Sequence, residues 1–270
     1  MDETTQPGPA KPLPPLVKPS EAPAGPGKRE PRHLASGQGA AWWSEGWQVF
    51  MAAPGTWIGI VVVLLLIMAA LTIVPFLGAL AQSVLMPVFA GGIALGCHAL
   101  AKGRPLTVGV LFDGFSGGRF MPLFIVGLIY LAAMFVVWMV VVVAILGVAG
   151  GAGLFSALSG DPSQIGMALF GSLGLTALII APIALLAAAA IAMGYWYAPA
   201  LVVLNGEEPI AAIQKSFKAS WVNLGASAVY GLIFIGLAIV ASIPLALGWL
   251  VLGPVTAGSW YASWRETFDA

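Results

Sequence analysis

Cys97 and His98 are adjacent residues whose types could do chemistry, because a thiolate and an imidazole are both metal ligands. Neighbouring residues of a helix project in different directions, however, and no second histidine, cysteine or acidic cluster joins them at ligand spacing. We therefore interpret Cys97 as a structural thiol and His98 as a histidine at the level of the lipid headgroups. No metal or other cofactor is expected.

Gln82 and Ser83 lie in an apolar stretch, where a serine hydroxyl could serve as a nucleophile. Such a hydroxyl needs a base to activate it, and no base or acid lies near these residues in the sequence. Ionisable side chains mark proton relays and ion pathways inside membranes, and the cores of the apolar stretches contain none. We therefore expect neither an enzyme nor a transporter driven by carboxylate protonation.

Charged residues border the apolar stretches. Asn205, Glu207 and Glu208 could bind a cation or a partner, although helix capping explains the same residues. The candidate contacts for anionic lipid headgroups or for a partner are Lys102, Arg104, Arg119, Lys215 and Lys218. The usual excess of basic residues on the cytoplasmic side of a membrane also explains these five, so both interpretations stay open.

The strongly apolar composition of the chain predicts the kind of element that carries these residues. Of 270 residues, 60% are hydrophobic and 8% are charged, whereas soluble proteins typically carry about 25% charged residues. The sequence therefore predicts an all-α polytopic membrane protein. Its formal net charge of zero gives no reason to expect nucleic acid as a partner. No secretory signal peptide is evident, since the first long apolar run begins only at Trp57.

The segment from Phe120 to Gly206 contains a single charged residue, Asp161. A bilayer core about 30 Å thick is spanned by about 20 apolar helical residues, so this segment has room for two spans that meet near Asp161. The tetrapeptide Asp161-Pro162-Ser163-Gln164 has the form of a capping box. We therefore interpret Asp161 as a helix cap at the far surface rather than as an intramembrane carboxylate.

Six transmembrane helices in three hairpins are predicted. The spans are Trp57–Val74, Leu77–Leu100, one inside Phe120–Gly150, one inside Ser163–Leu204, about Leu224–Ala241 and about Leu245–Trp264. The fourth cannot be one straight helix, because residues 163–204 would extend about 63 Å, twice the thickness of the hydrocarbon core. Pro182 and Pro199 offer the breaks.

A cytoplasmic amphipathic helix that lies in the headgroup region is predicted before each hairpin. These helices fall within residues 42–54, 103–115 and 210–221. Their apolar stripes are Trp43, Trp47, Phe50 and Pro54 in the first, Val108, Leu111, Phe112 and Phe115 in the second, and Ile210, Ile213, Phe217 and Trp221 in the third.

Two pairs of similar phrases suggest that the unit of surface helix and hairpin is an internal repeat. Residues 87–91 (PVFAG) resemble residues 254–258 (PVTAG), and residues 93–96 (IALG) resemble residues 191–194 (IAMG). Matches of this kind also arise by chance in a chain rich in alanine and glycine. The regular order of helices is therefore a firmer observation than the identities.

Glycine and proline are frequent inside the predicted spans. Glycine lets helix backbones approach closely in lipid, and Gly92-x-x-x-Gly96 and Gly147-x-x-x-Gly151 have the spacing of helix contact faces. The candidate span breaks are Pro87, Pro182 and Pro254. An interrupted span frees carbonyl groups that could line a pore or hold a neutral substrate.

Charge placement predicts the orientation of the chain. In the six-span arrangement all eleven Lys and Arg fall on one side of the membrane, so the positive-inside rule places both termini and the three amphipathic helices in the cytoplasm. Residues 1–38 are rich in proline and have no apolar periodicity. We predict a disordered cytoplasmic tail over residues 1–38 and a six-helix transmembrane domain over residues 39–270.

Several phrases resemble those of a known family. They are Gly46–Phe50 with Ala53-Pro54, then Gly96–Leu100 leading to Gly103–Leu106 and Leu111–Phe115, and finally Ala198–Leu204 running on to Ser216-Phe217 and Asn223. These phrases resemble an uncharacterised family of proteobacterial six-helix inner-membrane proteins, and the resemblance covers about residues 42–268. It implies a bacterial inner-membrane location and supplies no activity.

The sequence as a whole predicts a non-enzymatic organisational role. Its partners would be the lipid bilayer or other membrane proteins, reached through the cytoplasmic amphipathic helices. The alternative is a channel or facilitator for a small neutral solute, which the prolines inside the spans motivate. The oligomeric state is left open.

Overall fold

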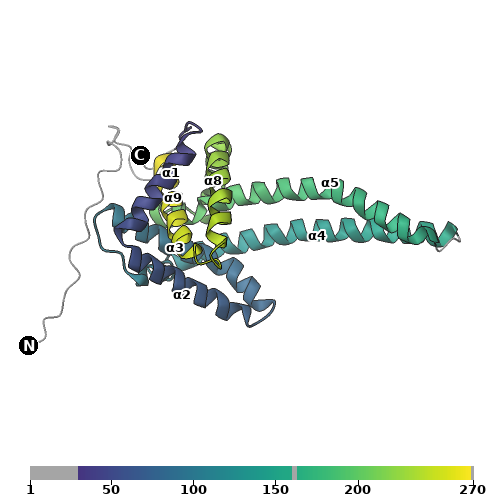
Figure 1. The fold of residues 1–270 in the computed structure, drawn as a ribbon, viewed down its shortest axis with the longest axis horizontal. Coiled ribbons are helices and arrows are strands. Elements are labelled where there is room, and N and C mark those ends of the chain that lie inside the picture. Colours follow the sequence, from purple (N-terminus) through teal and green to yellow (C-terminus); the bar gives the residue numbers. More distant parts are fainter. Residues whose placement is uncertain (1–29, 160–162, 269–270) are drawn as a thin grey trace, which may run out of the picture. The chain divides into compact units, whose positions relative to one another are not determined.

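Every regular element in residues 30–159 and 163–268, the part of the chain that this computed structural model describes, is a helix (Figure 1). In chain order the elements are α1 (Gln38–Ala52), α2 (Pro54–Thr72), α3 (Leu77–Ala101), η1 (Val108–Phe115), α4 (Phe120–Ser159), α5 (Ser163–Trp196), α6 (Ala198–Asn205), α7 (Pro209–Val222), α8 (Leu224–Ser242) and α9 (Trp249–Phe268). The all-α prediction is thus confirmed. The predicted cap Asp161 and residues 1–29 of the predicted tail lie outside the described residues.

The chain divides into two compact units. One contains residues 1–127 and 194–270, and the other contains residues 128–193, which belong to α4 and α5. Both of these helices are longer than a bilayer requires. The 40 residues of α4 would extend about 60 Å, twice the hydrocarbon thickness, so part of α4 must lie outside a bilayer core unless the helix is strongly tilted.

The candidate span breaks at Pro87, Pro182 and Pro254 do not end a helix. Each proline lies inside a helix that continues past it, α3, α5 and α9 respectively. A proline removes one backbone hydrogen bond, and in membrane proteins neighbouring helices and small adjustments of the backbone tolerate that loss. The break expected at Pro199 is present, because α5 ends at Trp196 and Pro199 lies in the first turn of α6.

Three helices of the first unit match predicted spans. Helices α2 and α3 begin and end within a few residues of the first two predictions, and α8 matches the fifth. Helix α9 begins at Trp249 rather than at Leu245. The reason is local, because Leu245 and Ala246 have positive φ angles of 51° and 62°, which no right-handed helix accommodates.

Five described segments are long and apolar enough to cross a membrane. They are Pro54–Thr72, Leu77–Ala101, Phe120–Val148, Ala177–Asn205 and Leu224–Ser242. Helix α9, the sixth predicted span, is not among them, so the arrangement of six spans is not confirmed. Most residues of α9 are buried, and its last turn carries the charged residues Arg265 and Glu266. A helix surrounded by protein needs no apolar surface towards lipid, which accounts for its lower hydropathy.

Helices α3, α6 and α9 form the centre of the first unit, and we call them the inner helices. Helix α3 packs on both α6 and α9. Two indole N–H groups of α9 reach the end of α5 and α6: Trp260 donates to the carbonyl of Trp196 at 2.8 Å, and Trp264 donates to the side-chain oxygen of Asn205 at 3.1 Å. Buried aromatic and small residues therefore fill this centre.

Each inner helix carries one short helix packed against it: η1 on α3, α7 on α6 and α1 on α9. We call α1, η1 and α7 the short helices. They correspond to the three predicted amphipathic helices, but they pack on other helices instead of lying alone in the headgroup region. A second difference is that η1 is a 3₁₀-helix, and its boundaries are narrower than the predicted residues 103–115. The last inner helix therefore pairs with the first short helix of the chain.

Glycine makes two of these pairings close. A Cβ at Gly46 of α1 would clash with the carbonyl of Val255, and a Cβ at Gly114 of η1 would clash with the carbonyl of Val88. These two valines directly follow Pro254 and Pro87 in the two similar phrases of the sequence. The same contact thus occurs at matching positions of α9 and α3, which supports the internal repeat.

The two predicted glycine contact faces differ. On α3, a Cβ at Gly92 would lie 2.8 Å from the carbonyl oxygen of Leu111, and one at Gly96 would lie 2.9 Å from the side chain of Val110, so this face packs within the chain. Around Gly147 and Gly151 of α4, no atom of the described structure lies within 4 Å of such a Cβ.

Residues 30–37, which belong to the predicted tail by composition, contact the first unit. The Asn223 side chain, between α7 and α8, accepts a hydrogen bond from the N–H of Leu34 at 2.7 Å and donates to the carbonyl of Arg32 at 2.8 Å. The N–H of Arg32 donates to the carbonyl of Thr267 in α9 at 3.1 Å. The start of the described chain is therefore fixed beside its end.

Candidate functional site: the outward faces of the short helices

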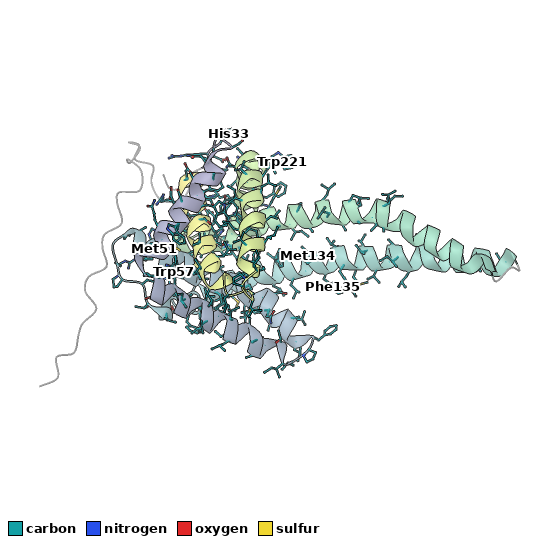
Figure 2. All side chains as sticks on the ribbon, viewed as in Figure 1. His33, Met51, Trp57, Met134, Phe135 and Trp221 are labelled. Atoms are coloured by element: carbon teal, nitrogen blue, oxygen red, sulfur yellow. The ribbon has the colours of Figure 1, made fainter. Side chains whose placement is uncertain are left out.

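Helix α7 turns most of its predicted apolar stripe away from the protein, whereas Ile213 is partly buried against the core. Ile210 and Trp221 are 63% and 61% exposed, and Phe217, which stacks on Trp221, is exposed as well. The face towards the protein is small and partly polar, with the buried residues Pro209, Ala212, Ser216, Ala219 and Ser220. A surface helix of a soluble protein has the opposite arrangement, so this face fits lipid or an apolar partner. Trp221 is labelled in Figure 2.

Helix α1 buries residues outside its predicted apolar stripe as well as residues within it. Trp42, Trp43 and Phe50 are buried, because α1 packs on α8 as well as on α9. Trp47 belongs to the predicted stripe but is 50% exposed. Met51, labelled in Figure 2, is one turn further on and is also exposed. The outward face of α1 is therefore formed by Trp47 and Met51.

The 3₁₀ geometry of η1 splits its predicted stripe between two faces. With three residues per turn, residues i and i+3 share a face. Leu111 and Gly114 share the buried face, whereas Phe112 and Phe115 are exposed on another, Phe112 to 46%. Both exposed rings also contact Phe89 of α3, with ring centroids 6.4 Å and 5.3 Å away. The outward face of η1 is thus aromatic.

Two of the five candidate cations are paired within the chain. Lys215 forms a salt bridge with Glu207, and Lys218 forms one with Glu30. The hydrogen bond and the positive charge of Lys218 lower the pKa of Glu30. These contacts balance both lysines of α7 with carboxylates, so that α7 has little positive charge left for anionic headgroups.

The other three candidate cations lie around η1. Lys102 and Arg104 are exposed, and neither forms a side-chain hydrogen bond or ion pair with any described residue. Arg119 donates from Nη1 to the main-chain carbonyl of Asp113 at 3.4 Å, which leaves its charge without a carboxylate partner in the described part of the chain. The structure therefore separates the five candidates into a paired group on α7 and a group around η1.

The residues that could have done chemistry contact other residues of this chain. Cys97 is buried with its sulfur 3.9 Å from the carbonyl of Ala257, and His98 Nδ1 lies 2.9 Å from the Tyr261 hydroxyl. Ser83 donates to the carbonyl one turn before it, as helical serines commonly do. Among the described residues, no three His, Cys, Asp or Glu side chains are placed to hold a metal ion.

The acidic segment before α7 also has structural partners. Asn205 accepts the hydrogen bond from Trp264, and Glu207 pairs with Lys215. Glu208 occupies the N-cap position of α7, but its side chain makes no capping hydrogen bond. Thus Asn205 and Glu207 bind other parts of this chain, and capping does not explain Glu208.

Two sets of polar contacts between α1 and α9 were not predicted from the sequence. Glu266 accepts hydrogen bonds from the side chains of Gln38 and Trp42, the latter at 2.6 Å. Arg265 forms a salt bridge of 2.6 Å with Glu45, where burial raises the pKa of Glu45 and the nearby guanidinium opposes that shift. The partners lie more than 200 positions apart, so no local pattern could have indicated them.

A search among known proteins found a relative that matches most of the chain. The chain is 30% identical over 216 residues to a probable inner membrane protein of Burkholderia thailandensis, across 80% of this chain and 78% of the relative. The chain belongs to this family of proteobacterial inner-membrane proteins. The resemblance predicted from the sequence is thereby confirmed, and an inner-membrane protein with several apolar helices agrees with the fold. No known family profile and no solved structure matches.

Proposed function

We propose that this family member has a non-enzymatic, organisational role in the inner membrane and contacts lipids or other membrane proteins through its short helices. The observation that supports this most is the outward apolar face of α7, formed by Ile210, Phe217 and Trp221. Helix α7 packs on the protein through small residues and leaves its large apolar side chains outside. Such side chains are favourable on a surface that lipid or another membrane protein covers.

Contacts between the two ends of the described chain support six spans. The N–H of Arg32 bonds to Thr267, and the Gln38 side chain bonds to Glu266. Segments in direct contact lie on the same side of a membrane, so the chain between them crosses an even number of times. Five segments meet the length and hydropathy of a span, and α9 would supply the sixth.

The basic residues support a cytoplasmic location for this side. In a six-span arrangement all eleven Lys and Arg of the sequence fall on the side of the termini, where the positive-inside rule places the cytoplasm. The short helices would then face the cytoplasmic leaflet.

The alternative, a channel or facilitator for a small neutral solute, has less support. It was motivated by interrupted spans, and the helices continue through Pro87, Pro182 and Pro254. The inner helices also meet through buried side chains such as Trp260 and Trp264. We therefore place this alternative second.

Crosslinking in native membranes followed by co-purification tests the proposed role. We expect reproducible membrane-protein partners or a lipid preference with the natural chain, and a loss of recovered partner of about tenfold in the double variant Phe217→Ser/Trp221→Ser. The matched control is Leu232→Ser/Ile239→Ser, because these two side chains are also exposed and apolar but lie on α8. The absence of any reproducible partner and of any lipid preference would overturn the proposal.

A further inference from the structure

The segment between α3 and α4, residues 102–119, combines basic ends with an aromatic middle, and we call it the η1 loop. Lys102 and Arg104 lie at its start and Arg119 at its end, while Phe112 and Phe115 are exposed between them. Polar cations at the ends and apolar rings in the middle are the two features that an interfacial lipid site requires.

The depth of the η1 loop follows from the helices beside it. Pro54 begins α2, a candidate span, and therefore marks one edge of the apolar layer. A Cβ at Gly59, about 7 Å along α2 from that edge, would lie 3.2 Å from the Val108 side chain. Later in the η1 loop, Gly114 lies against Val88, which is in the middle of α3. The η1 loop thus enters the apolar layer, and Arg119 marks its return, because Phe120 begins the next candidate span.

This path matches the two parts of a phospholipid. Amphipathic segments at an interface bury their apolar face about 5–10 Å below the headgroups, which is the depth that the contact of Val108 with Gly59 indicates. Lys102 follows the end of α3 and lies outside the span, at the level where headgroups add about 5–7 Å to each side of the hydrocarbon core. Arg104 stays at the end of α3, because its main-chain N–H bonds to the carbonyl of Ala99 at 2.9 Å, and Arg119 directly precedes the candidate span that begins at Phe120. By these positions the three cations are level with phosphate, and the two rings between them are level with acyl chains.

Charge distinguishes the η1 loop from α7. The η1 loop has three cations and one acidic residue, Asp113, which leaves an excess of positive charge. On α7, by contrast, Lys215 and Lys218 are balanced by Glu207 and Glu30. Both surfaces offer exposed aromatic rings, but only the η1 loop complements a negative headgroup.

We propose that the η1 loop binds an anionic phospholipid of the cytoplasmic leaflet. The guanidinium and ammonium groups of Lys102, Arg104 and Arg119 hold the phosphate-bearing headgroup, and Phe112 and Phe115 contact the acyl chains. This inference rests on the proposed function and deepens it, because it names the lipid class and separates a headgroup-selective surface from the unselective surface of α7.

Lipid retention by the full-length protein tests this site. The protein is reconstituted in vesicles of equal phosphatidylglycerol and phosphatidylcholine, extracted in mild detergent, and the retained lipids are counted by native mass spectrometry. We expect the natural chain to retain phosphatidylglycerol preferentially, and the triple variant Lys102→Gln/Arg104→Gln/Arg119→Gln to lose that preference by about tenfold or more. The matched control Lys215→Gln/Lys218→Gln keeps it.

Further arms separate charge from folding. Arg104→Lys/Arg119→Lys keeps the charge and should keep the preference, whereas Phe112→Ala/Phe115→Ala should lower retention of both lipids about equally. If the triple variant is not monodisperse, the salt dependence of the natural chain tests the site instead. Its preference for phosphatidylglycerol should fall several-fold between 0.05 M and 1 M salt, because salt screens the attraction between the cations and the headgroup.

The inference is overturned by a triple variant that still prefers phosphatidylglycerol, by an equal loss in the α7 control, or by a preference that salt leaves unchanged. These results leave one readout of the crosslinking experiment independent, namely the recovery of membrane-protein partners and its loss in Phe217→Ser/Trp221→Ser. A failure of the lipid site is therefore distinguishable from a failure of the proposed function.

Discussion

Buried polar side chains hold the ends of the described chain together. Asn223 is fully enclosed, and its amide bonds to the main chain of Arg32, Leu34 and Ala219, so both polar atoms have partners. Removing a buried group of this kind leaves main-chain groups unpaired, and each unpaired group costs free energy. Single polar residues can thus contribute more to this fold than the ion pairs of α7, which are less deeply buried than Asn223.

For Asn223→Ala we expect the free energy of unfolding to fall by about 2–3 kcal/mol, because several buried hydrogen bonds are lost. Thermal unfolding in detergent measures the effect, and proteolysis should cleave residues 30–37 faster. Gln214→Ala is the control, since Gln214 is exposed on α7 and should change little. An Asn223→Ala protein as stable as the natural chain would show that the amide does not hold this segment.

Glu45 should make stability depend on pH. Burial raises its pKa above the ordinary value of about 4.5, so the folded state holds the proton more tightly than the unfolded state. The contribution of Glu45 to stability is therefore greatest below about pH 4.5 and falls as the pH rises from there through the raised pKa. Melting temperatures between pH 4 and 8 should decline less steeply in Glu45→Gln, and an unchanged slope would contradict this assignment.

Sequence reasoning found the charged residues but not their partners. Lys218 was a candidate for lipid headgroups, yet it pairs with Glu30. Asn223 occurred in a family-like phrase with no role attached to it, and two of its main-chain partners, Arg32 and Leu34, lie about 190 positions away. Local spacing predicts what shares a helix face, whereas contacts between distant segments depend on the fold.

At the scale of elements, each short helix packs against one inner helix through a small residue. Gly46 and Gly114 let α1 and η1 approach the main chain of α9 and α3, at a carbonyl that follows a proline in both cases. The third pairing uses Ser216 of α7, whose hydroxyl accepts the N–H of Tyr197 at 2.9 Å. Small residues are thus required wherever a short helix meets an inner helix.

Gly46→Ala should lower the free energy of unfolding by about 1–3 kcal/mol, because its Cβ would overlap the Val255 carbonyl and force α1 away from α9. Gly114→Ala should behave alike if the two contacts are equivalent. The control is Gly231→Ala on α8, where no described atom lies within 4 Å of the new Cβ and alanine favours the helix. Unfolding curves of the three variants compare them, and equal stability of Gly46→Ala and Gly231→Ala would refute the close approach.

The existence of the short helices could be predicted from periodicity, but their direction and type could not. Of the predicted stripe Ile210, Ile213, Phe217 and Trp221, three residues are exposed and Ile213 is partly buried against the core, and a stripe alone does not say whether it faces protein or lipid. For η1, a spacing of three and four residues favoured an α-helix, whereas Phe112 and Phe115 share a face through a 3₁₀ turn. Packing on α3 decides that geometry, and packing is absent from a local pattern.

At the scale of the whole molecule, hydropathy alone finds one span fewer among the described residues than the six that we propose. Five segments are apolar enough for lipid, and α9 is not, because its neighbours bury most of its surface. The contact of Arg32 with Thr267 supplies the missing constraint, since the two ends must share one side of the membrane. We therefore expect α9 to complete a hairpin with α8.

Labelling of introduced cysteines tests this account most directly. In a background with the single natural cysteine removed (Cys97→Ala), a membrane-impermeant maleimide is applied to cells whose outer membrane is permeabilised, before and after lysis. Phe76→Cys and Leu245→Cys, both in exposed turns, should be labelled before lysis, and Lys102→Cys only after it. If Leu245→Cys were protected until lysis while Phe76→Cys reacted at once, α8 and α9 would not form a spanning hairpin and the six-span account would be contradicted.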